Sequence, residues 1–246
     1  MGNLSGLKPN RRQLLVAGAA AAVAGVVSTE TAGTASAADP YGSGDLGDWT
    51  ILSRSISTAG TITYVRDNDG VCMFGDSIAV QDGKALATKL LNRGISLAVH
   101  NWSGRPTTPA VDALENWAIK YGLPRRILMA TGTNDIFNPP VLAAQIDRTM
   151  RIVGSNRKVV WVNTQISRTA KSAAIQVADQ RNSAWINSQI HDAEKKYPNL
   201  DIVRWAEYLA AKPSRLTELL REGVHTTVPA GQDARNDLMV QALISS

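Results

Sequence analysis

From residue 70 onward, short apolar runs alternate with longer segments of helical periodicity. The apolar runs cover residues 71–74, 95–99, 127–130, 159–162 and 202–205. Each is short and several are rich in β-branched residues, as in strands that are buried on both faces. Strands that alternate with helices require right-handed crossovers, and they form a parallel sheet with helices on both faces. The pattern therefore predicts an α/β fold, a three-layer α/β/α sandwich around a mostly parallel five-stranded sheet.

The segments between these runs repeat apolar residues at three- and four-residue steps, which is typical of amphipathic helices. The clearest stripe contains one polar member, Asn182, and the last helix is expected to begin near Gly231. The stripe consists of Ile175, Ala178, Asn182, Ile186, Ile190, Ala193 and Tyr197. With 246 residues, 44% hydrophobic, the chain can bury the core of one globular domain, and no internal repeat is visible. We assign this domain to residues 70–246 and regard residues 38–69 as a lead-in segment.

The first 37 residues have the three parts of a bacterial export signal. Arg11 and Arg12 precede an apolar stretch over residues 14–27, and Ala35-Ser36-Ala37 forms a small-residue cleavage site. The stretch is short and rich in Ala and Gly, which argues against a stable membrane span. The paired arginines resemble a twin-arginine signal, although a general export signal can also contain two arginines. We expect cleavage after Ala37 and a secreted or cell-envelope protein.

Charge and histidine spacing exclude several classes of ligand. The net charge is +5, and basic and acidic residues are mixed along the chain without a long Lys/Arg run, so no nucleic-acid partner is expected. His100, His191 and His225 share no metal-ligand spacing, so no metal site is expected. Residues 42–47 match the dinucleotide pattern G-x-G-x-x-G. However, a signal precedes them and no helix pattern follows, so we reject that site.

Ser77 follows the first predicted strand directly and precedes a helical stretch over residues 78–92. Open parallel sheets bind their ligands beyond the carboxyl ends of the strands. A serine at this turn can present its hydroxyl to that cleft, next to the positive end of a helix dipole. Serine is also a favoured N-cap, so the position alone leaves a purely structural role open.

Two more polar turns follow predicted strands, and each contains a glycine. The second strand runs into Asn101-Trp102-Ser103-Gly104, and the third into Gly132-Thr133-Asn134-Asp135. The backbone N–H groups of Ser77 and Gly104 and the Asn134 amide could together hold a developing oxyanion. Each turn taken alone is also consistent with ordinary loop chemistry.

His225 stands shortly before the last predicted helix, three residues after Glu222. A carboxylate at this spacing can fold back to accept the imidazole Nδ1–H, which leaves Nε2 free to take a proton from a serine. A backbone carbonyl could accept the same hydrogen bond, so the role of Glu222 stays open at this point.

These four segments, in this order, resemble the SGNH hydrolases, also called the GDSL esterase/lipase family. The four residues that name the family correspond to Ser77, Gly104, Asn134 and His225. The resemblance covers residues 71 to about 244 and implies a flavodoxin-like fold and ester hydrolysis through an acyl-enzyme, without a cofactor. The first motif reads Gly-Asp-Ser-Ile instead of Gly-Asp-Ser-Leu, and Glu222 stands where the family usually has Asp.

The expected substrate is a small-molecule or glycan ester, and no obligate protein partner is inferred. The loops at 103–109 and 135–140 are short, which favours small acyl groups, and Trp102 and Phe137 are candidates for an apolar rim. An α/β-hydrolase is excluded because its G-x-S-x-G elbow is missing. Two alternatives stay open: an acetyl esterase that acts on glycans, and a non-catalytic protein of the same fold that binds glycan or lipid.

Overall fold

A computed structural model describes residues 39–245, and these contain a central six-stranded sheet and a separate two-stranded hairpin. The spatial order in the large sheet is β1-β3-β2-β4-β5-β6. All neighbouring pairs are parallel except β1 and β3. The strands are β1 (Arg54–Ile56), β2 (Val71–Gly75), β3 (Leu97–Trp102), β4 (Arg126–Ala130), β5 (Lys158–Val162), β6 (Leu200–Val203), β7 (Leu220–Arg221) and β8 (His225–Thr226).

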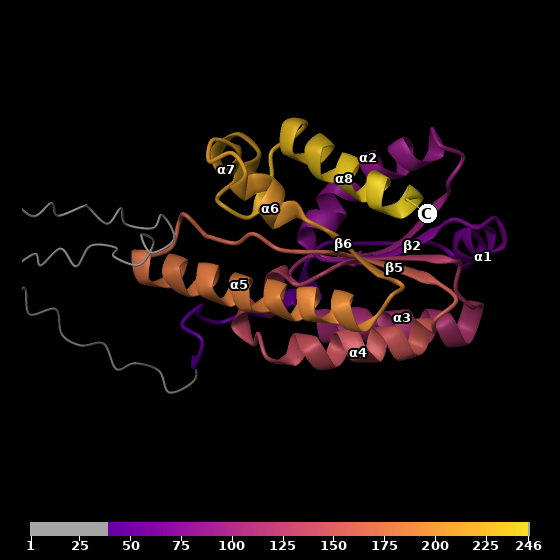
Figure 1. The fold of residues 1–246 in the computed structure, drawn as a ribbon, viewed down its shortest axis with the longest axis horizontal. Helices are drawn as coiled ribbons and strands as arrows, with labels where there is room; N and C mark the ends of the chain where they lie inside the picture. Colours follow the sequence, from indigo (N-terminus) through magenta and orange to yellow (C-terminus); the bar gives the residue numbers. More distant parts are fainter. Residues whose placement is uncertain (1–38, 246) are drawn as a thin grey trace, which may run out of the picture. The chain divides into compact units, whose positions relative to one another are not determined.

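Helices cover both faces of the sheet, as Figure 1 shows. On one face lie α3, α4 and α5, which pack side by side, and on the other lie α2, α6 and α8. The helices are α1 (Ala59–Asp67), α2 (Ser77–Leu91), α3 (Thr107–Tyr121), α4 (Val141–Val153), α5 (Ala173–Lys196), α6 (Trp205–Ala210), α7 (Arg215–Glu218) and α8 (Ala230–Ile244), with short 3-10 helices η1 (Trp49–Ile51) and η2 (Thr133–Phe137).

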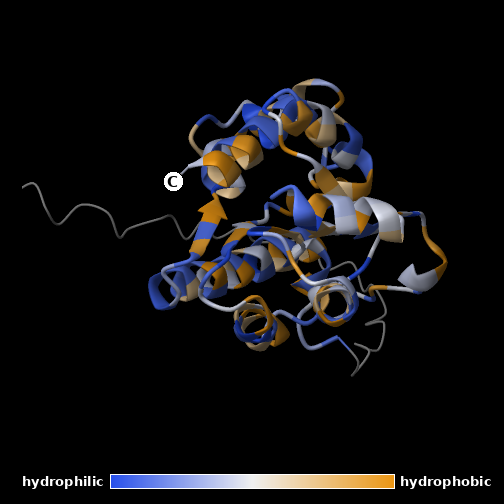
Figure 2. Ribbon diagram, turned by 90° about the vertical axis from the view of Figure 1, so that its right-hand side faces the viewer, coloured by the Kyte–Doolittle hydropathy of each residue, from blue (hydrophilic) through white to orange (hydrophobic). Residues whose placement is uncertain are grey.

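The core consists of two apolar clusters, one on each side of the sheet. Successive side chains of a strand point to opposite faces of the sheet. In β2, Cys72 and Phe74 therefore belong to one cluster, and Val71 and Met73 to the other. All five residues of β2 are buried, as expected for a central parallel strand. The helices carry hydrophobic and hydrophilic residues together, as Figure 2 shows. The predicted α/β/α sandwich is confirmed.

The five parallel strands follow the spatial order 2-1-3-4-5 along the chain, which is the flavodoxin-like order. The order of the strands reverses at β2, whose neighbours are β3 on one side and β4 on the other. Sheets of this kind bind their ligands at such a reversal, beyond the carboxyl ends of the strands. Ser77 follows β2, and Asn134 follows the neighbouring strand β4. The topology therefore brings two of the candidate site residues to the same edge of the sheet.

The sheet has one strand more than the five expected. β1 lies within residues 38–69, the lead-in segment, and pairs antiparallel with β3, with Arg54 opposite Trp102. Its three residues are all exposed, so no apolar pattern marks them in the sequence. The lead-in segment also contributes η1 and α1, and Ile62 and Val65 of α1 belong to the core.

The predicted export signal, residues 1–37, lies outside the described residues. Within residues 39–245, no helix is both long enough and apolar enough to cross a membrane.

Candidate active site

The turn after β2 exposes the Ser77 hydroxyl at the first residue of α2. Asp76 is the N-cap of this helix, and its carboxylate accepts a hydrogen bond from the Ile78 N–H at 3.0 Å. The capping role that was open for Ser77 is therefore filled by its neighbour. Only glycine fits just before the turn, because a Cβ on Gly75 would lie 2.1 Å from the Cβ of Ala79.

Ser77, His225 and Glu222 form one chain of hydrogen bonds. The Ser77 Oγ lies 2.8 Å from Nε2 of His225, and Nδ1 of His225 is hydrogen-bonded to the Glu222 carboxylate. A carboxylate can only accept, so this contact assigns the proton to Nδ1 and leaves Nε2 to accept from the serine hydroxyl. Ser77 and His225 are half-buried, which leaves the pair open to a substrate.

The hairpin β7–β8 holds His225 above α2. Thr226, next to His225, donates its hydroxyl to both carboxylate oxygens of Asp82, at 2.9 and 3.0 Å. Gln81 Nε2 donates to the Thr226 hydroxyl oxygen at 2.6 Å. Asp82 is fully buried on α2, and the Arg235 guanidinium lies 3.7 Å from its carboxylate. These contacts fix the strand of the histidine to the helix that begins with the serine.

Two hydrogen bonds connect the turn that carries Glu222 to the loop at residues 167–169. The Ser167 N–H donates to the carbonyl of Gly223 at 3.0 Å, and the Thr169 N–H donates to the carbonyl of Glu222 at 3.1 Å. Gly223 has a φ of 74°, and a Cβ there would lie 1.9 Å from the Ser167 carbonyl oxygen. Glycine is therefore required at this position both by conformation and by space.

Three hydrogen-bond donors expected at an oxyanion hole lie on the turns after β2, β3 and β4. Within residues 39–245, the backbone N–H groups of Ser77 and Gly104 make no hydrogen bond to a protein acceptor. Gly104 has a φ of 72° in the turn after β3. Asn134 lies in η2 and donates one amide hydrogen bond to the Arg105 carbonyl at 3.2 Å. An amide has two N–H donors, so the second is available to a ligand.

Asp135 joins the last two of these turns. Its carboxylate accepts from the Thr107 N–H at 3.1 and 3.2 Å and from the Thr107 hydroxyl at 2.6 Å, at the start of α3. Complete burial raises the pKa of Asp135 to about 7, although the hydrogen bonds from Thr107 act in the opposite direction. The turn with Asn134 is thereby bound to the helix that follows Gly104.

Arg105 joins the ends of β2 and β3. Its guanidinium donates to the carbonyl of Gly75 at 2.8 Å and to Nδ1 of His100 at 2.7 Å. Burial lowers the pKa of Arg105 to about 10. Burial, together with the charge of Arg105, lowers the pKa of His100 to about 4, so His100 is a neutral acceptor. Reasoning from the sequence missed Arg105 and Asp135. Their only signal was that each charged residue directly follows a candidate donor.

The two residues suggested for an apolar rim have different surroundings. Trp102 packs edge-on against Trp49, with ring centroids 5.1 Å apart, and its Nε1 donates to the Leu52 carbonyl at 3.1 Å. Phe137 lines a pocket of about 210 Å³ together with Leu46, Pro106, Thr108, Asn134, Asp135, Asn138 and Val141. A larger hollow of about 760 Å³ is lined by residues such as Arg66 and Arg157, near the amino ends of the strands.

Comparison with solved structures finds many proteins of the same fold. A GDSL-like lipase from Bacteroides thetaiotaomicron has a TM-score of 0.59 at 17% identity, over 72% of this chain and 88% of the lipase. The catalytic domain of peptidoglycan O-acetyltransferase A from Streptococcus pneumoniae has a TM-score of 0.58 at 21% identity, over 71% of this chain and 92% of that domain. An acetyl xylan esterase has a TM-score of 0.51 at 18% identity, over 71% of this chain and 100% of the esterase.

No protein-family model matches the sequence, and no curated protein is significantly similar to it. The similarity to the SGNH hydrolases is therefore one of fold, and at this level the predicted resemblance is confirmed. No group of three His, Cys, Asp or Glu side chains within the described part of the chain is arranged to hold a metal ion.

Proposed function

We propose that this protein is an exported serine esterase that hydrolyses small or short-acyl carboxylic esters. The observation that carries the proposal is the 2.8 Å contact between the Ser77 hydroxyl and Nε2 of His225, at the N-terminus of α2. A nucleophile and a base within hydrogen-bond reach, with the base oriented by a third group, form the arrangement used in nucleophilic catalysis. Here the third group is Glu222.

In the first half of the reaction, the Ser77 Oγ attacks the ester carbonyl carbon while Nε2 of His225 takes the hydroxyl proton. The Glu222 carboxylate stabilises the imidazolium that forms. The oxyanion is held by the N–H groups of Ser77 and Gly104 and by the second N–H of Asn134. Loss of one such donor typically costs about 3 kcal/mol of transition-state stabilisation. The intermediate then collapses, and the alcohol leaves with the proton of His225.

In the second half, the acyl group is bonded to Ser77. A water molecule gives its proton to His225 and attacks the acyl carbonyl carbon. Collapse of the second tetrahedral intermediate releases the carboxylic acid, and His225 returns the proton to Ser77. Apart from the substrate and water, all the groups in this cycle belong to the chain itself, so the proposal requires no cofactor.

The proposal is tested by the variant Ser77→Ala on p-nitrophenyl acetate, with the exposed and remote Ser188→Ala as the matched control. Ser77→Ala should fold and lose nearly all turnover, because no other group can form the acyl-enzyme. A fluorophosphonate probe should label Ser77 in the unmodified protein and in Ser188→Ala. Labelling of another serine, or full turnover by Ser77→Ala, contradicts the proposal. If the unmodified protein is folded but shows no turnover and no labelling, the non-catalytic binding alternative is supported.

A second candidate is an esterase that removes acetyl groups from glycans. Two of the similar structures are described as a peptidoglycan O-acetyltransferase and an acetyl xylan esterase, so the same fold serves acetylated glycans in other proteins. The pocket of about 210 Å³ beside Asn134 has room for an acetyl group and for longer short-chain acyl groups. Acetate release from acetylated xylan and from O-acetylated peptidoglycan, compared with hydrolysis of butyrate esters, distinguishes the two candidates. The export signal predicted in residues 1–37 supports action outside the cytoplasm in both cases.

A further inference from the structure

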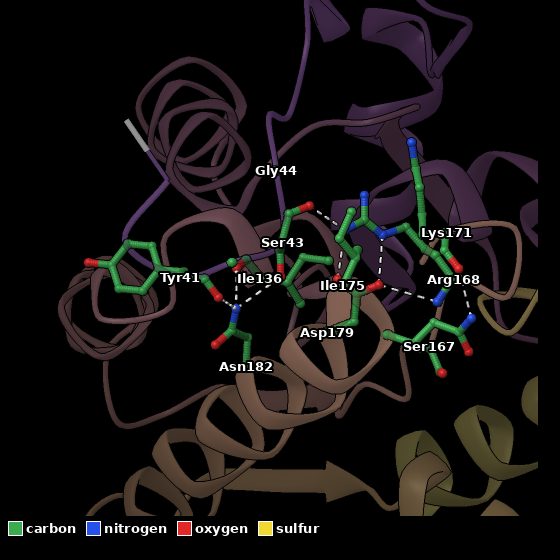
Figure 3. Close-up of polar contacts among 12 residues, drawn as sticks. Tyr41, Ser43, Gly44, Ile136, Ser167, Arg168, Lys171, Ile175, Asp179 and Asn182 are labelled. Atoms are coloured by element: carbon green, nitrogen blue, oxygen red, sulfur yellow. Dashed lines mark hydrogen bonds and ion pairs between the residues drawn. The ribbon is translucent and has the colours of Figure 1, made fainter. Parts of the chain in front are cut away.

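Residues 39–47 form no helix or strand, yet a buried side chain of α5 anchors them. Asn182, the polar member of the apolar stripe, is fully buried and donates to three acceptors (Figure 3). These are the Tyr41 carbonyl at 3.0 Å, the Ser43 hydroxyl at 2.9 Å and the Ile136 carbonyl at 3.0 Å. A buried amide left without partners destabilises a folded protein, so the helix and the segment stabilise one another.

Two arginines add further contacts to the same segment. Arg168 donates to the Ser43 carbonyl and is itself held by the buried carboxylate of Asp179, at 2.6 and 2.8 Å (Figure 3). Arg181 donates to the Tyr41 carbonyl. The Asp39 carboxylate accepts from the N–H groups of Gly42 and Gly44, at 2.8 and 2.6 Å, which closes the segment into a turn. The segment is thus a fixed part of the fold.

From these anchors the segment continues to a pocket beside Asn134, one of the candidate oxyanion donors. Leu46 is half-buried and lines the 210 Å³ pocket, in which it faces the same space as Phe137 and Asn134. The Arg168 guanidinium lies 5.0 Å from the centroid of the Phe137 ring, so one arginine contacts both the segment and the pocket wall. Further along, Trp49 packs against the turn of Gly104, where an added Cβ would lie 2.9 Å from the Cβ of Trp49.

If Ser77 and His225 act as proposed, Asn134 connects the pocket to the acyl side of the reaction. The leaving alcohol receives its proton from Nε2 of His225, so it must lie toward the hairpin β7–β8. No residue of that hairpin lines the pocket, whereas Asn134, a candidate donor to the carbonyl oxygen, does. The lining contributed by Leu46, Pro106, Phe137 and Val141 is apolar. A volume of about 210 Å³ is below the roughly 300–1,000 Å³ of sites for drug-sized ligands.

We propose that residues 39–47 form one wall of the acyl pocket, and that Leu46 limits the length of the acyl chain that the enzyme accepts. The inference rests on the proposed function, because it requires an acyl group on Ser77. It assigns a role in substrate selection to a segment that precedes the predicted catalytic domain. Asn182 and Arg168 act as positioning residues for this wall.

The test is an acyl-chain series of p-nitrophenyl esters, from acetate to octanoate, with Leu46→Ala, Leu46→Trp and the control Ile51→Ala. Ile51 lies in the same lead-in segment, is 79% exposed and does not line the pocket. Leu46→Ala should raise kcat/KM for hexanoate relative to acetate about tenfold, since a methylene in an apolar pocket is worth about tenfold or more. Leu46→Trp should lower the butyrate-to-acetate ratio by a similar factor, and Ile51→Ala should match the unmodified enzyme.

A second measurement keeps this proposal separate from the proposed function. Short- and long-chain alkyl fluorophosphonates report access to Ser77 without turnover, and Leu46→Ala should speed labelling by the long-chain probe alone. If Ser77 is labelled and the chain-length profile of Leu46→Ala equals that of Ile51→Ala, the proposed role of Leu46 is refuted. The assignment of Ser77 as the nucleophile is then still supported. If no ester is hydrolysed and Ser77 is not labelled, both proposals fail together.

The anchoring by Asn182 is tested in the same assays. Asn182→Ala should broaden the chain-length profile in the direction of Leu46→Ala. It should also increase hydrogen exchange at the Gly42 and Gly44 amides, because the segment loses its two hydrogen bonds from Asn182, at Tyr41 and Ser43. An unchanged profile together with unchanged exchange overturns the role of Asn182 in holding the wall.

Discussion

Glu222 is hydrogen-bonded to Nδ1 of His225 while its own backbone lies in the left-handed region, at a φ of 42°. This conformation is uncommon for a residue with a side chain, and such strain persists only where the surrounding structure imposes it. Here the carbonyls of Glu222 and Gly223 accept hydrogen bonds from the loop at Ser167 and Thr169. The carboxylate, and not a backbone carbonyl, is therefore the acceptor for the imidazole.

Glu222→Gln should lower kcat on a short-chain ester by about 10²–10⁴-fold with little change in KM, because the wrong imidazole tautomer is then favoured. Glu222→Asp should retain part of the activity, since it keeps the charge with a shorter reach. The exposed Glu218→Gln is the matched control. A loss of less than tenfold in folded Glu222→Gln would reduce the site to a dyad of Ser77 and His225.

Gly223→Ala should impair both folding and catalysis, because its Cβ would lie 1.9 Å from the Ser167 carbonyl oxygen. The matched control is Gly94→Ala. Gly94 has a φ of 73°, close to the 74° of Gly223, and a Cβ there meets nothing within 4 Å. Both variants carry backbone strain of about 1–3 kcal/mol, but only Gly223→Ala should also lose kcat by a large factor. Equal effects of the two variants on kcat would show that the contact with Ser167 is unimportant.

Thr226→Val should destabilise the fold by about 1–3 kcal/mol, because the buried Asp82 loses the hydroxyl donor while the shape of the side chain is kept. It should also lower kcat, since the contact fixes the strand of His225 to the helix of Ser77. Thr88→Val, at an exposed position of the same helix, should change the free energy of unfolding by less than about 0.5 kcal/mol. Urea denaturation of both variants, followed by steady-state kinetics, measures these effects. A Thr226→Val variant that is as stable and active as Thr88→Val contradicts the prediction.

Asp135 should make the stability of the protein fall as the pH rises from about 4 to about 7. Burial raises its pKa to about 7, so in this range the folded state keeps a proton that the unfolded state releases. The stabilising contribution is complete at low pH and is lost as the pH rises through the folded pKa. Relative to Asp135→Asn, the unmodified protein should lose up to about 4 kcal/mol across this window and little more above it. Urea denaturation at several pH values tests this, and parallel pH profiles of the two proteins would disprove it.

The N-terminal segment predicts that secreted protein begins at or near Ala38, with Asp39 close to the new N-terminus. N-terminal sequencing of secreted material tests the cleavage. Replacement of Arg11 and Arg12 together by lysine should block secretion if the twin-arginine route is used. Unchanged secretion of that double variant points to the general route, and an intact N-terminus on extracellular protein refutes cleavage.

The alternation of short apolar runs with helical periods was sufficient to predict the layers of the fold. The rule for open parallel sheets added the expectation that the turns after the strands lie at one edge. Parallel strands align their carboxyl ends, so residues as far apart as Ser77 and Asn134 share one edge. Element limits were less accurate: the strand expected at 95–99 spans Leu97–Trp102, because paired neighbours decide where a strand ends.

Only the tertiary structure decided which polar residues are buried and what they hold. Arg and Asp are residue types that usually lie on the surface, but Arg105 and Asp135 are buried beneath the candidate site. Their hydrogen bonds join three turns there. The exposed strand β1 and the segment around Leu46 carry no periodic pattern, because their positions depend on partners more than 40 residues away. Local periodicity determines secondary structure, whereas burial and long-range hydrogen bonds exist only after the chain has folded.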